Sequence, residues 1–130
     1  MLGRVRQLMI ASVLVALLAG GTIFAAADKA DASASQCPSG YFCVWEHSPF
    51  GGHFAYFSKG SFDLDNPIGG FVFNNKITDV WNRTGTDWCL NDGKNGIGPH
   101  KEISSGYQGY TLEFNDRTSS INKVGLGGFC

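Results

Sequence analysis

The chain has 130 residues, a formal net charge of −1 and 18 glycines, and only 16% of its residues are charged. This near-neutral balance gives no basic face of the kind that nucleic-acid binding needs, so we exclude nucleic acid as a partner. The length allows one small domain with a modest hydrophobic core.

Residues 1–27 predict a secretory signal peptide. Arg4 and Arg6 form a positively charged n-region, the apolar run 8–18 is too short to span a bilayer, and three alanines then offer a cleavage site. A second site follows Ala34. Cleavage at the first site leaves 103 of the 130 residues, with 8 basic and 11 acidic residues and a net charge of about −3. We expect a secreted, extracellular protein with no membrane segment after cleavage.

All four cysteines follow the signal peptide, and an even number in a small secreted domain predicts two disulfides. Of the three possible connectivities we favour Cys37–Cys43, which closes a tight loop, and Cys89–Cys130, which ties the C-terminus to the middle of the chain. A zinc site is the competing interpretation, but the sequence has no C-x-x-C pair and export favours oxidation.

Residues 28–36, rich in Ala, Ser and Asp, predict a disordered linker, so the expected domain spans 37–130. This domain shows no helical period; short aromatic and β-branched runs alternate with Gly, Asn, Asp and Pro. We expect about eight short antiparallel strands, at 41–46, 53–57, 70–73, 78–82, 88–90, 101–103, 109–114 and 120–124. The intervening segment 58–67 is expected to be a loop. The frequent turns and glycines predict an all-β sandwich or barrel of two Greek-key units.

Aromatic side chains are expected to fill most of this core, because they carry most of the burial in a small domain. The candidates are Trp45, Phe54, Tyr56, Phe71, Phe73, Trp81, Trp88 and Phe114. An aromatic binding strip is the alternative for some of them.

One polar phrase occurs twice in the domain. It runs from Phe73 to Val80 and again from Phe114 to Ile121, an offset of 41 residues. In both copies an aromatic residue is followed by two Asn/Asp residues, a basic residue, a variable residue, Ser/Thr and, one position later, an aliphatic residue. The repetition indicates two versions of one supersecondary unit.

The hairpin segment Trp45–Gly52 resembles the βγ-crystallin signature, in which a second aromatic stands five positions after the first and a glycine two positions beyond. In the second hairpin, taken as 90–98, Asn95 stands where the signature has its second aromatic. The repeated phrase looks like the calcium motif that closes each Greek key in microbial βγ-crystallins. Its first copy ends in Asp79, where the motif has Ser.

Over nearly the whole domain the chain resembles the secreted actinobacterial peptidase inhibitor family I36. The matching segments are Cys37–Glu46, Phe50–Gly52, Val80–Thr84, Trp88–Leu90 and Phe114–Ser120. The resemblance implies a βγ-crystallin-like fold and a monomeric inhibitor of secreted peptidases, in particular metallopeptidases, that inserts a loop into the active-site cleft.

By the same resemblance, two calcium sites would be shared between the repeats. One would pair Asp116 with Thr78, the other Asn75 with Ser119. The predicted ligand set is Asn75, Lys76, Thr78, Asp116, Arg117, Ser119 and Ser120, with Lys76 and Arg117 contributing backbone carbonyls. The alternative is that these polar residues make Asx turns and cap strands. A calcium-binding structural or stress-protective protein is therefore our second hypothesis, and a secreted toxin or cell-surface binding protein a weaker third.

An inhibitor of this kind presents a loop that the scaffold holds rigid. The segments 63–70 and 91–100 are long enough, and the second follows Cys89, whose disulfide would stiffen it. Our candidate inhibitory residues are Asn91, Asp92, Gly93, Lys94 and Asn95. The alternative is that both segments are ordinary Gly/Asn-rich connections.

Catalysis finds no support in the sequence, which lacks H-E-x-x-H, G-x-S-x-G and P-loop motifs. We expect a protein that is not an enzyme. His47, His53 and His100 are expected to be surface residues rather than metal ligands. The glycosylation sequon at 82–84 is expected to be a coincidence, with Arg83 serving packing or an ion pair.

Overall fold

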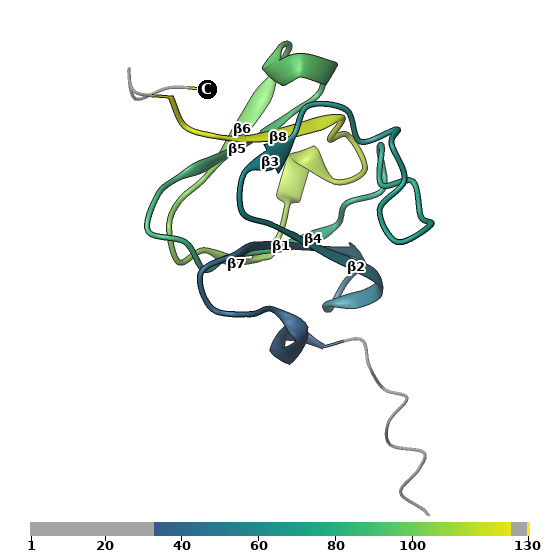
Figure 1. Ribbon diagram of the computed structural model, residues 1–130, viewed down its shortest axis with the longest axis vertical. Helices are drawn as coiled ribbons and strands as arrows, with labels where there is room; N and C mark the ends of the chain where they lie inside the picture. Colours follow the sequence, from purple (N-terminus) through teal and green to yellow (C-terminus); the bar gives the residue numbers. More distant parts are fainter. Residues whose placement is uncertain (1–32, 126–129) are drawn as a thin grey trace, which may run out of the picture. The chain divides into compact units, whose positions relative to one another are not determined.

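The computed structural model describes residues 33–125 and Cys130, which form two antiparallel four-stranded sheets (Figure 1). The first has the order β2-β1-β4-β7, with β1 (Phe42–His47), β2 (Gly51–Phe57), β4 (Asp79–Asn82) and β7 (Gln108–Tyr110). The second has the order β3-β8-β5-β6, with β3 (Gly60–Ser61), β8 (Ser120–Lys123), β5 (Trp88–Asn91) and β6 (His100–Ile103). Strand β7, from the second half of the chain, completes the first sheet, and β3, from the first half, completes the second. This arrangement confirms the predicted pair of Greek keys.

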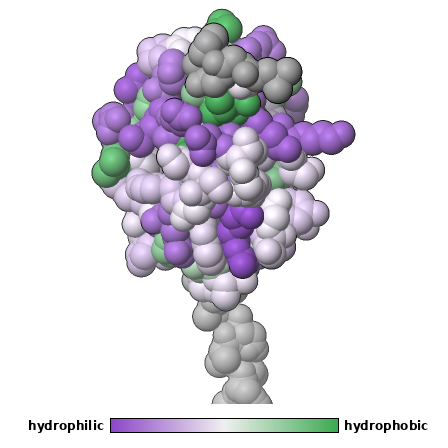
Figure 2. All heavy atoms as spheres, turned by 90° about the vertical axis from the view of Figure 1, so that its left-hand side faces the viewer, coloured by the Kyte–Doolittle hydropathy of each residue, from purple (hydrophilic) through white to green (hydrophobic). Residues whose placement is uncertain are grey.

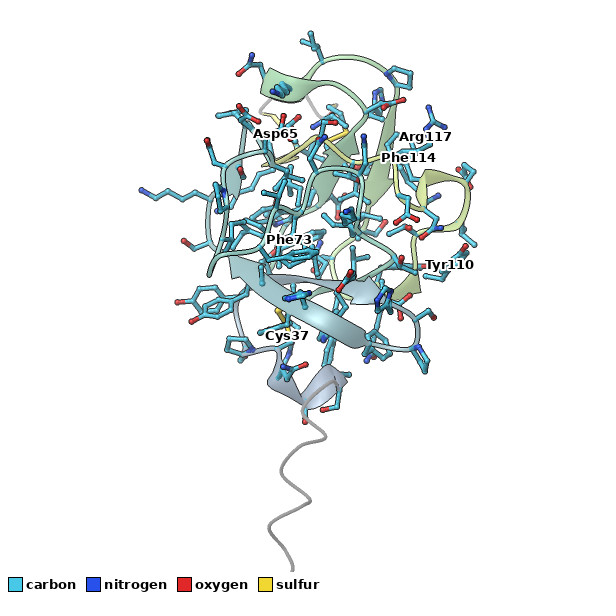
Figure 3. All side chains as sticks on the ribbon, turned by 90° about the vertical axis from the view of Figure 1, so that its right-hand side faces the viewer. Cys37, Asp65, Phe73, Tyr110, Phe114 and Arg117 are labelled. Atoms are coloured by element: carbon cyan, nitrogen blue, oxygen red, sulfur yellow. A yellow bond between two sulfur atoms is a disulfide. The ribbon has the colours of Figure 1, made fainter. Side chains whose placement is uncertain are left out.

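The main core lies between the two sheets. Alternation along β1 and β5 directs Phe42 and Trp88 inward, where their rings stack at a centroid distance of 4.7 Å. Phe73 lies between the sheets in Figure 3, on a segment that is not a strand. The other buried members are Val44, Ala55, Phe57, Leu64, Ile77, Val80, Leu90, Ile103, Phe114 and Ile121.

A second, smaller cluster covers the outer face of the first sheet. It consists of Cys37, Cys43 and Trp45, and Figure 3 shows Cys37 beyond that sheet from Phe73. The indole N–H of Trp45 donates to Oε1 of Gln36 at 3.0 Å, and the backbone N–H of Ser33 donates to the same oxygen at 3.0 Å. The expectation of a disordered linker is therefore wrong for 33–36, of which Ala34–Gln36 form the 3-10 turn η2. The rest of the linker and the signal peptide lie outside the described residues.

Both favoured disulfides are present. Cys37 and Cys43 are joined across a sequence separation of 6 residues, and Cys89 and Cys130 across 41. The first staples the N-terminal segment to β1, while the second ties the C-terminal residue to β5.

Three strand predictions were wrong in detail. The segment 70–73 is not a strand, because Gly69 and Gly70 form a left-handed turn (φ 59° and 87°) that bridges Ile68 to Phe71. Strand β3 lies inside the expected loop 58–67; a side chain at Gly60 would collide with the carbonyl oxygen of Ile121. The expected strand 109–114 divides into the end of β7 and the 3-10 turn η4 (Leu112–Phe114).

The predicted aromatic core is half right. Trp45, Phe73, Trp88 and Phe114 are buried, whereas Phe54, Phe71 and Trp81 are half-buried and Tyr56 is 52% exposed. Strand alternation places Trp45, Phe54, Tyr56 and Trp81 together on the outer face of the first sheet. Trp45 is the buried member of this group, in the small cluster with Cys37 and Cys43. In the described part of the chain, no helix has the length and apolar character needed to span a bilayer.

Candidate functional site

The two copies of the repeated phrase bind each other through their backbones. Asn75 and Asp116 occupy the same position in the phrase, and both adopt left-handed conformations (φ 58° and 59°), which Asn and Asp tolerate. The N–H of Asn75 donates to the carbonyl of Thr118 at 2.9 Å, and the N–H of Asp116 donates to the carbonyl of Ile77 at 3.0 Å. The repeats are thus related by an approximate two-fold arrangement, and each completes the other's turn.

This crossing brings the predicted calcium pairs together. Asp116 lies beside the 77–78 backbone, and Asn75 beside the 118–119 backbone. Asn75 and Asp116 are exposed, Thr78 is half-buried and Ser119 is buried. Among the described residues none of these four side chains takes part in a hydrogen bond, whereas Arg117 pairs with Asp92 at 2.7 Å.

The Ser120 hydroxyl makes two hydrogen bonds to the second hairpin. It donates to the carbonyl of Gly93 at 2.6 Å and accepts from the N–H of Gly96 at 2.9 Å. Asp79, at the same position in the first copy, accepts from the N–H of Phe50 at 2.8 Å through Oδ2. Both side chains therefore tie a sheet to the hairpin beside it.

These bonds also correct the predicted alignment of the second hairpin. Gly96 is the counterpart of Phe50, and both are left-handed (φ 73° and 52°). Asn91 is the counterpart of Trp45, because the two residues pair with Ser120 and Asp79. The expectation that Asn95 holds the aromatic position was wrong by one residue. Neither Leu90 nor Asn91 is aromatic, so the sequence of this hairpin does not mark its first position.

The predicted inhibitory residues divide into two groups. Asn91 is buried in β5, where its side chain donates to Oδ1 of Asn122 at 2.7 Å. The hairpin loop begins at Asp92, and η3 (Lys94–Gly96) lies at its tip. Figure 1 shows this loop projecting at one end of the second sheet, beyond β5 and β6.

The two segments predicted as alternative inhibitory loops lie against each other. The N–H of Asn95 donates to the carbonyl of Phe62 at 2.8 Å. The Lys94 ammonium lies 2.7 Å from the Asp65 carboxylate and 3.5 Å from that of Asp63. The hydrogen bond that Lys94 donates to Asp65, followed by the negative charge of Asp63, raises the pKa of Lys94. We call these segments, 61–65 and 92–98, the two-loop surface.

Two residues of this surface were missed by the sequence reasoning. Ile97 is 64% exposed and Phe62 is 60% exposed, the highest values among the large hydrophobic side chains described. The available signal was the setting of Ile97, a large apolar residue in a run of turn-forming residues, whereas Phe62 stands two positions before Leu64 and has no such setting. The described residues enclose no pocket.

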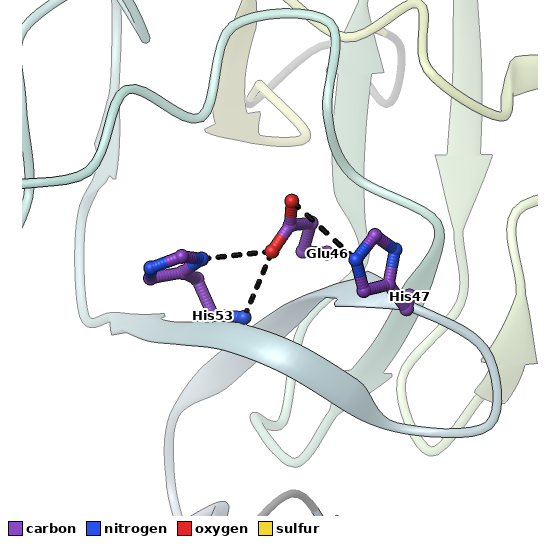
Figure 4. A network of polar contacts seen from close by, with 3 residues as sticks. All are labelled: Glu46, His47 and His53. Carbon is purple, nitrogen blue, oxygen red and sulfur yellow. Dashed lines mark hydrogen bonds and ion pairs between the residues drawn. The ribbon is translucent and has the colours of Figure 1, made fainter.

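The first hairpin carries a separate polar cluster (Figure 4). Oε1 of Glu46 accepts from the backbone N–H of His53 at 3.1 Å and lies 2.8 Å from Nδ1 of that residue. His47 lies 3.5 Å from the same carboxylate. The side-chain hydrogen bond with His53 is the main cause that lowers the pKa of Glu46. In the part of the chain described, no group of three His, Cys, Asp or Glu side chains is placed to hold a metal ion.

The sequon lies inside the fold. Asn82 is fully buried, and its amide donates to the carbonyls of Thr86 and Ile103 at 2.9 and 3.0 Å. Arg83 donates to the carbonyl of Cys37 at 2.7 Å and stacks on Trp81 at 4.6 Å. The packing role predicted for Arg83 is confirmed, and the Asn82 amide is committed to the fold.

Solved βγ-crystallin domains share this architecture. The N-terminal domain of protein S is 19% identical, covers 66% of this chain and 97% of its own, and superposes with a TM-score of 0.55. A domain from Clostridium beijerinckii is 17% identical (64% and 95% covered, TM-score 0.55), and one from Ciona intestinalis 22% identical (65% and 99%, TM-score 0.54). At such identities the likeness establishes the fold alone: the molecule is a βγ-crystallin-like domain.

The family is established by the sequence. The chain matches peptidase inhibitor family I36 over residues 30–103, more than half of its length, and it belongs to that family. The resemblance inferred from the motifs is thereby confirmed. No curated protein matches the chain.

Proposed function

We propose that the protein is a secreted inhibitor of peptidases, in particular metallopeptidases, and that it places the β5–β6 hairpin loop in the enzyme's active-site cleft. Membership of family I36 supports the inhibitory role. The two disulfides and the signal peptide expected at 1–27 support a secreted location. The inhibitor binds without chemistry of its own.

The observation that carries this proposal is the double hydrogen bond of Ser120. One hydroxyl holds Gly93 and Gly96, which stand on either side of the loop tip. The N–H of Gly93 also donates to the carbonyl of Ile97 at 2.9 Å. A loop held in this way loses little conformational entropy when it binds, so more of the contact energy appears as affinity.

The same bonds support slow cleavage of the loop by the peptidase. A peptidase must bring the scissile bond and its neighbours into an extended, accessible geometry. Here Asn95 and Gly96 are left-handed, and their N–H groups donate to Phe62 and Ser120. Opening the loop would break these bonds, so the hairpin can occupy a cleft while remaining a poor substrate.

The direct test is a titration of a thermolysin-like metallopeptidase with the mature, oxidised protein, monitored by hydrolysis of a small peptide substrate. The proposal predicts stoichiometric loss of activity with the inhibitor chain still intact. A Ser120→Ala variant should inhibit less well and be degraded faster, because its hairpin is released. Full peptidase activity at inhibitor excess, with rapid degradation of the wild-type protein, would refute the proposal.

Calcium binding is a second candidate function, favoured by unused oxygen atoms at the crossing of the two repeats. The buried Oδ1 atoms of Asn74 and Asn115, again at equivalent positions, have no hydrogen-bond partner among the described residues. The side-chain oxygens of Asn75, Thr78, Asp116 and Ser119 are equally free of bonds there. Oxygen donors of this type fit a calcium ion.

The charge at these positions predicts weak binding. Asp116 supplies one carboxylate to the first pair, whereas Asn75 supplies none to the second. Few charged ligands place affinity towards the range of roughly 10⁻⁴–10⁻³ M found in extracellular modules. Thermal unfolding should shift upward at millimolar calcium relative to chelator, since calcium would bind only the folded state. Asp116→Asn should reduce the shift, and an equal midpoint in calcium and in chelator would remove this candidate.

A further inference from the structure

The second hairpin lacks the aromatic pair that fills the first. In the first hairpin, the ring of Phe50 packs edge-on against Trp45 at a centroid distance of 5.0 Å. The equivalent residues in the second hairpin are Gly96 and Asn91, so this hairpin brings no aromatic filling of its own. A Cβ at Gly96 would lie 3.9 Å from Cε1 of Phe62. An aromatic side chain from the other loop therefore lies where the hairpin's own is missing.

Phe62 differs from Phe50 in its exposure to solvent. Phe50 is half-buried, whereas Phe62 remains 60% exposed. The next position holds Gly51 in the first hairpin and Ile97 in the second, where the side chain is 64% exposed. The hairpin needs no side chain at this position, as Gly51 shows, so Ile97 is not explained by folding. Figure 2 shows one face of the molecule, on which the coloured hydrophobic atoms form small separate groups among polar ones.

We propose that Phe62 and Ile97 form one apolar contact that recognises a peptidase with a pocket for aliphatic or aromatic side chains. Ile97 enters the pocket, and Phe62 covers its rim. This inference rests on the proposed inhibitory function and assigns the specificity of the same site. Two exposed apolar side chains on a rigid support are the type of anchor that dominates the binding energy of protein interfaces.

The charges around the contact support an apolar partner. Lys94 is the cation at the loop tip, and it is held between Asp63 and Asp65 on the other loop. Presenting Lys94 to an acidic pocket would break both ion pairs. The two-loop surface therefore offers side chains to an apolar pocket and withholds its lysine, which argues against peptidases that select basic residues.

The pairing of the loops should matter as much as the two side chains. The hydrogen bond from Asn95 to the Phe62 carbonyl and the ion pairs of Lys94 set the position of Phe62 relative to the hairpin. Without them the two apolar side chains would have to be ordered during binding. A Lys94→Ala variant should thus weaken binding to an apolar-selective enzyme, even though the lysine does not enter the pocket.

The experiment compares inhibition constants of the full mature protein against thermolysin, which selects apolar side chains, and trypsin, which selects basic ones. Wild type should inhibit thermolysin and leave trypsin unaffected. Phe62→Ala and Ile97→Ala should each raise the thermolysin inhibition constant at least tenfold, and Lys94→Ala about threefold. Val72→Ala is the matched control: Val72 is also an exposed apolar loop residue, lies outside the two-loop surface, and should change the constant less than twofold. Near-ultraviolet circular dichroism verifies that each variant is folded.

The outcomes separate the two proposals. If wild type inhibits thermolysin but Phe62→Ala and Ile97→Ala, both folded, inhibit equally well, the contact assignment is overturned and the inhibitory function stands. Inhibition of trypsin that is lost in Lys94→Ala would also overturn the assignment, since Lys94 would then be the primary contact. If wild type inhibits neither enzyme nor binds an inactivated form of either, the proposed function fails and the contact assignment fails with it.

Discussion

The two hairpins of this domain share their backbone conformation but differ in the exposure of their apolar side chains. Each is tied to its sheet by one side chain of the repeated phrase, Asp79 in the first and Ser120 in the second. The first hairpin packs the half-buried Phe50 against Trp45. The second has Gly96 at the position of Phe50, and the next residue, Ile97, is exposed. Both copies of the duplicated unit therefore keep the hydrogen bonds that hold the hairpin to its sheet. The apolar surface of the second copy is not used in the core and is available for binding a partner.

A carboxylate at an equivalent position in each hairpin, Glu46 or Asp92, also has different partners. Glu46 follows Trp45, and Asp92 follows its counterpart Asn91. Glu46 bonds to His53 of the same hairpin, whereas Asp92 pairs with Arg117 of the repeated phrase. The carboxylate of the first hairpin thus bonds within its own hairpin, whereas the carboxylate of the second bonds to the other repeat.

The largest expected effect comes from the disulfides, one of which stabilises each half. Replacing Cys89 and Cys130 by alanine should cost about 4 kcal/mol of unfolding free energy, and replacing Cys37 and Cys43 about 2 kcal/mol, because the longer loop restricts the unfolded chain more. Denaturant unfolding of both double variants measures the difference. Equal losses would show that the second half does not depend on its covalent tie more than the first.

An exchange of the two anchoring residues should give a smaller and asymmetric effect. Ser120→Asp should cost about 2 kcal/mol, because a carboxylate cannot donate to the Gly93 carbonyl. Asp79→Ser should be nearly neutral, since it keeps an acceptor for Phe50 and removes Oδ1, a buried oxygen without a partner among the described residues. Chemical unfolding of the two variants tests this, and a larger loss in Asp79→Ser would mean that the hairpins are anchored differently from our description.

The smallest expected effect is the pH dependence of the first hairpin. The pKa of Glu46 is lowered in the folded protein from its ordinary value of 4.5, so its ionised form stabilises the fold above that value. This contribution is lost as the pH falls through the lowered pKa. Glu46→Gln should therefore have a lower melting temperature than wild type at about pH 5.5, with the gap closing towards about pH 3. Glu102→Gln, an exposed change on β6, serves as control. A gap that stays constant over this range would contradict the assignment.

Much of the fold could be predicted because it depends on local chemistry. The cysteine positions, the glycine-rich turns and the repeated phrase indicated two disulfide-linked Greek keys, and all of these features are present. The strand at Gly60–Ser61 could not be predicted, because it forms by pairing with β8, in which Ile121 lies 60 residues further along the chain than its partner Ser61. Its two residues carry no pattern of their own.

The site was predicted less well for the same reason. The segments 63–70 and 91–100 were selected separately as long loops, but nothing in their sequences shows that Lys94 reaches Asp65 or that Asn95 bonds Phe62. The register that makes Asn91 the counterpart of Trp45 likewise comes from the pairing of β5 with β8, which the hairpin sequence does not contain. Non-local contacts decide both points, and composition does not report them.

Hydrogen exchange of the protein with and without a bound metallopeptidase tests most directly whether the second hairpin has become the recognition surface. We predict that binding will slow exchange of the amides at 92–98 and 61–65 and leave those at 47–52 in the first hairpin unchanged. Protection of the first hairpin with no change in the second would contradict the account.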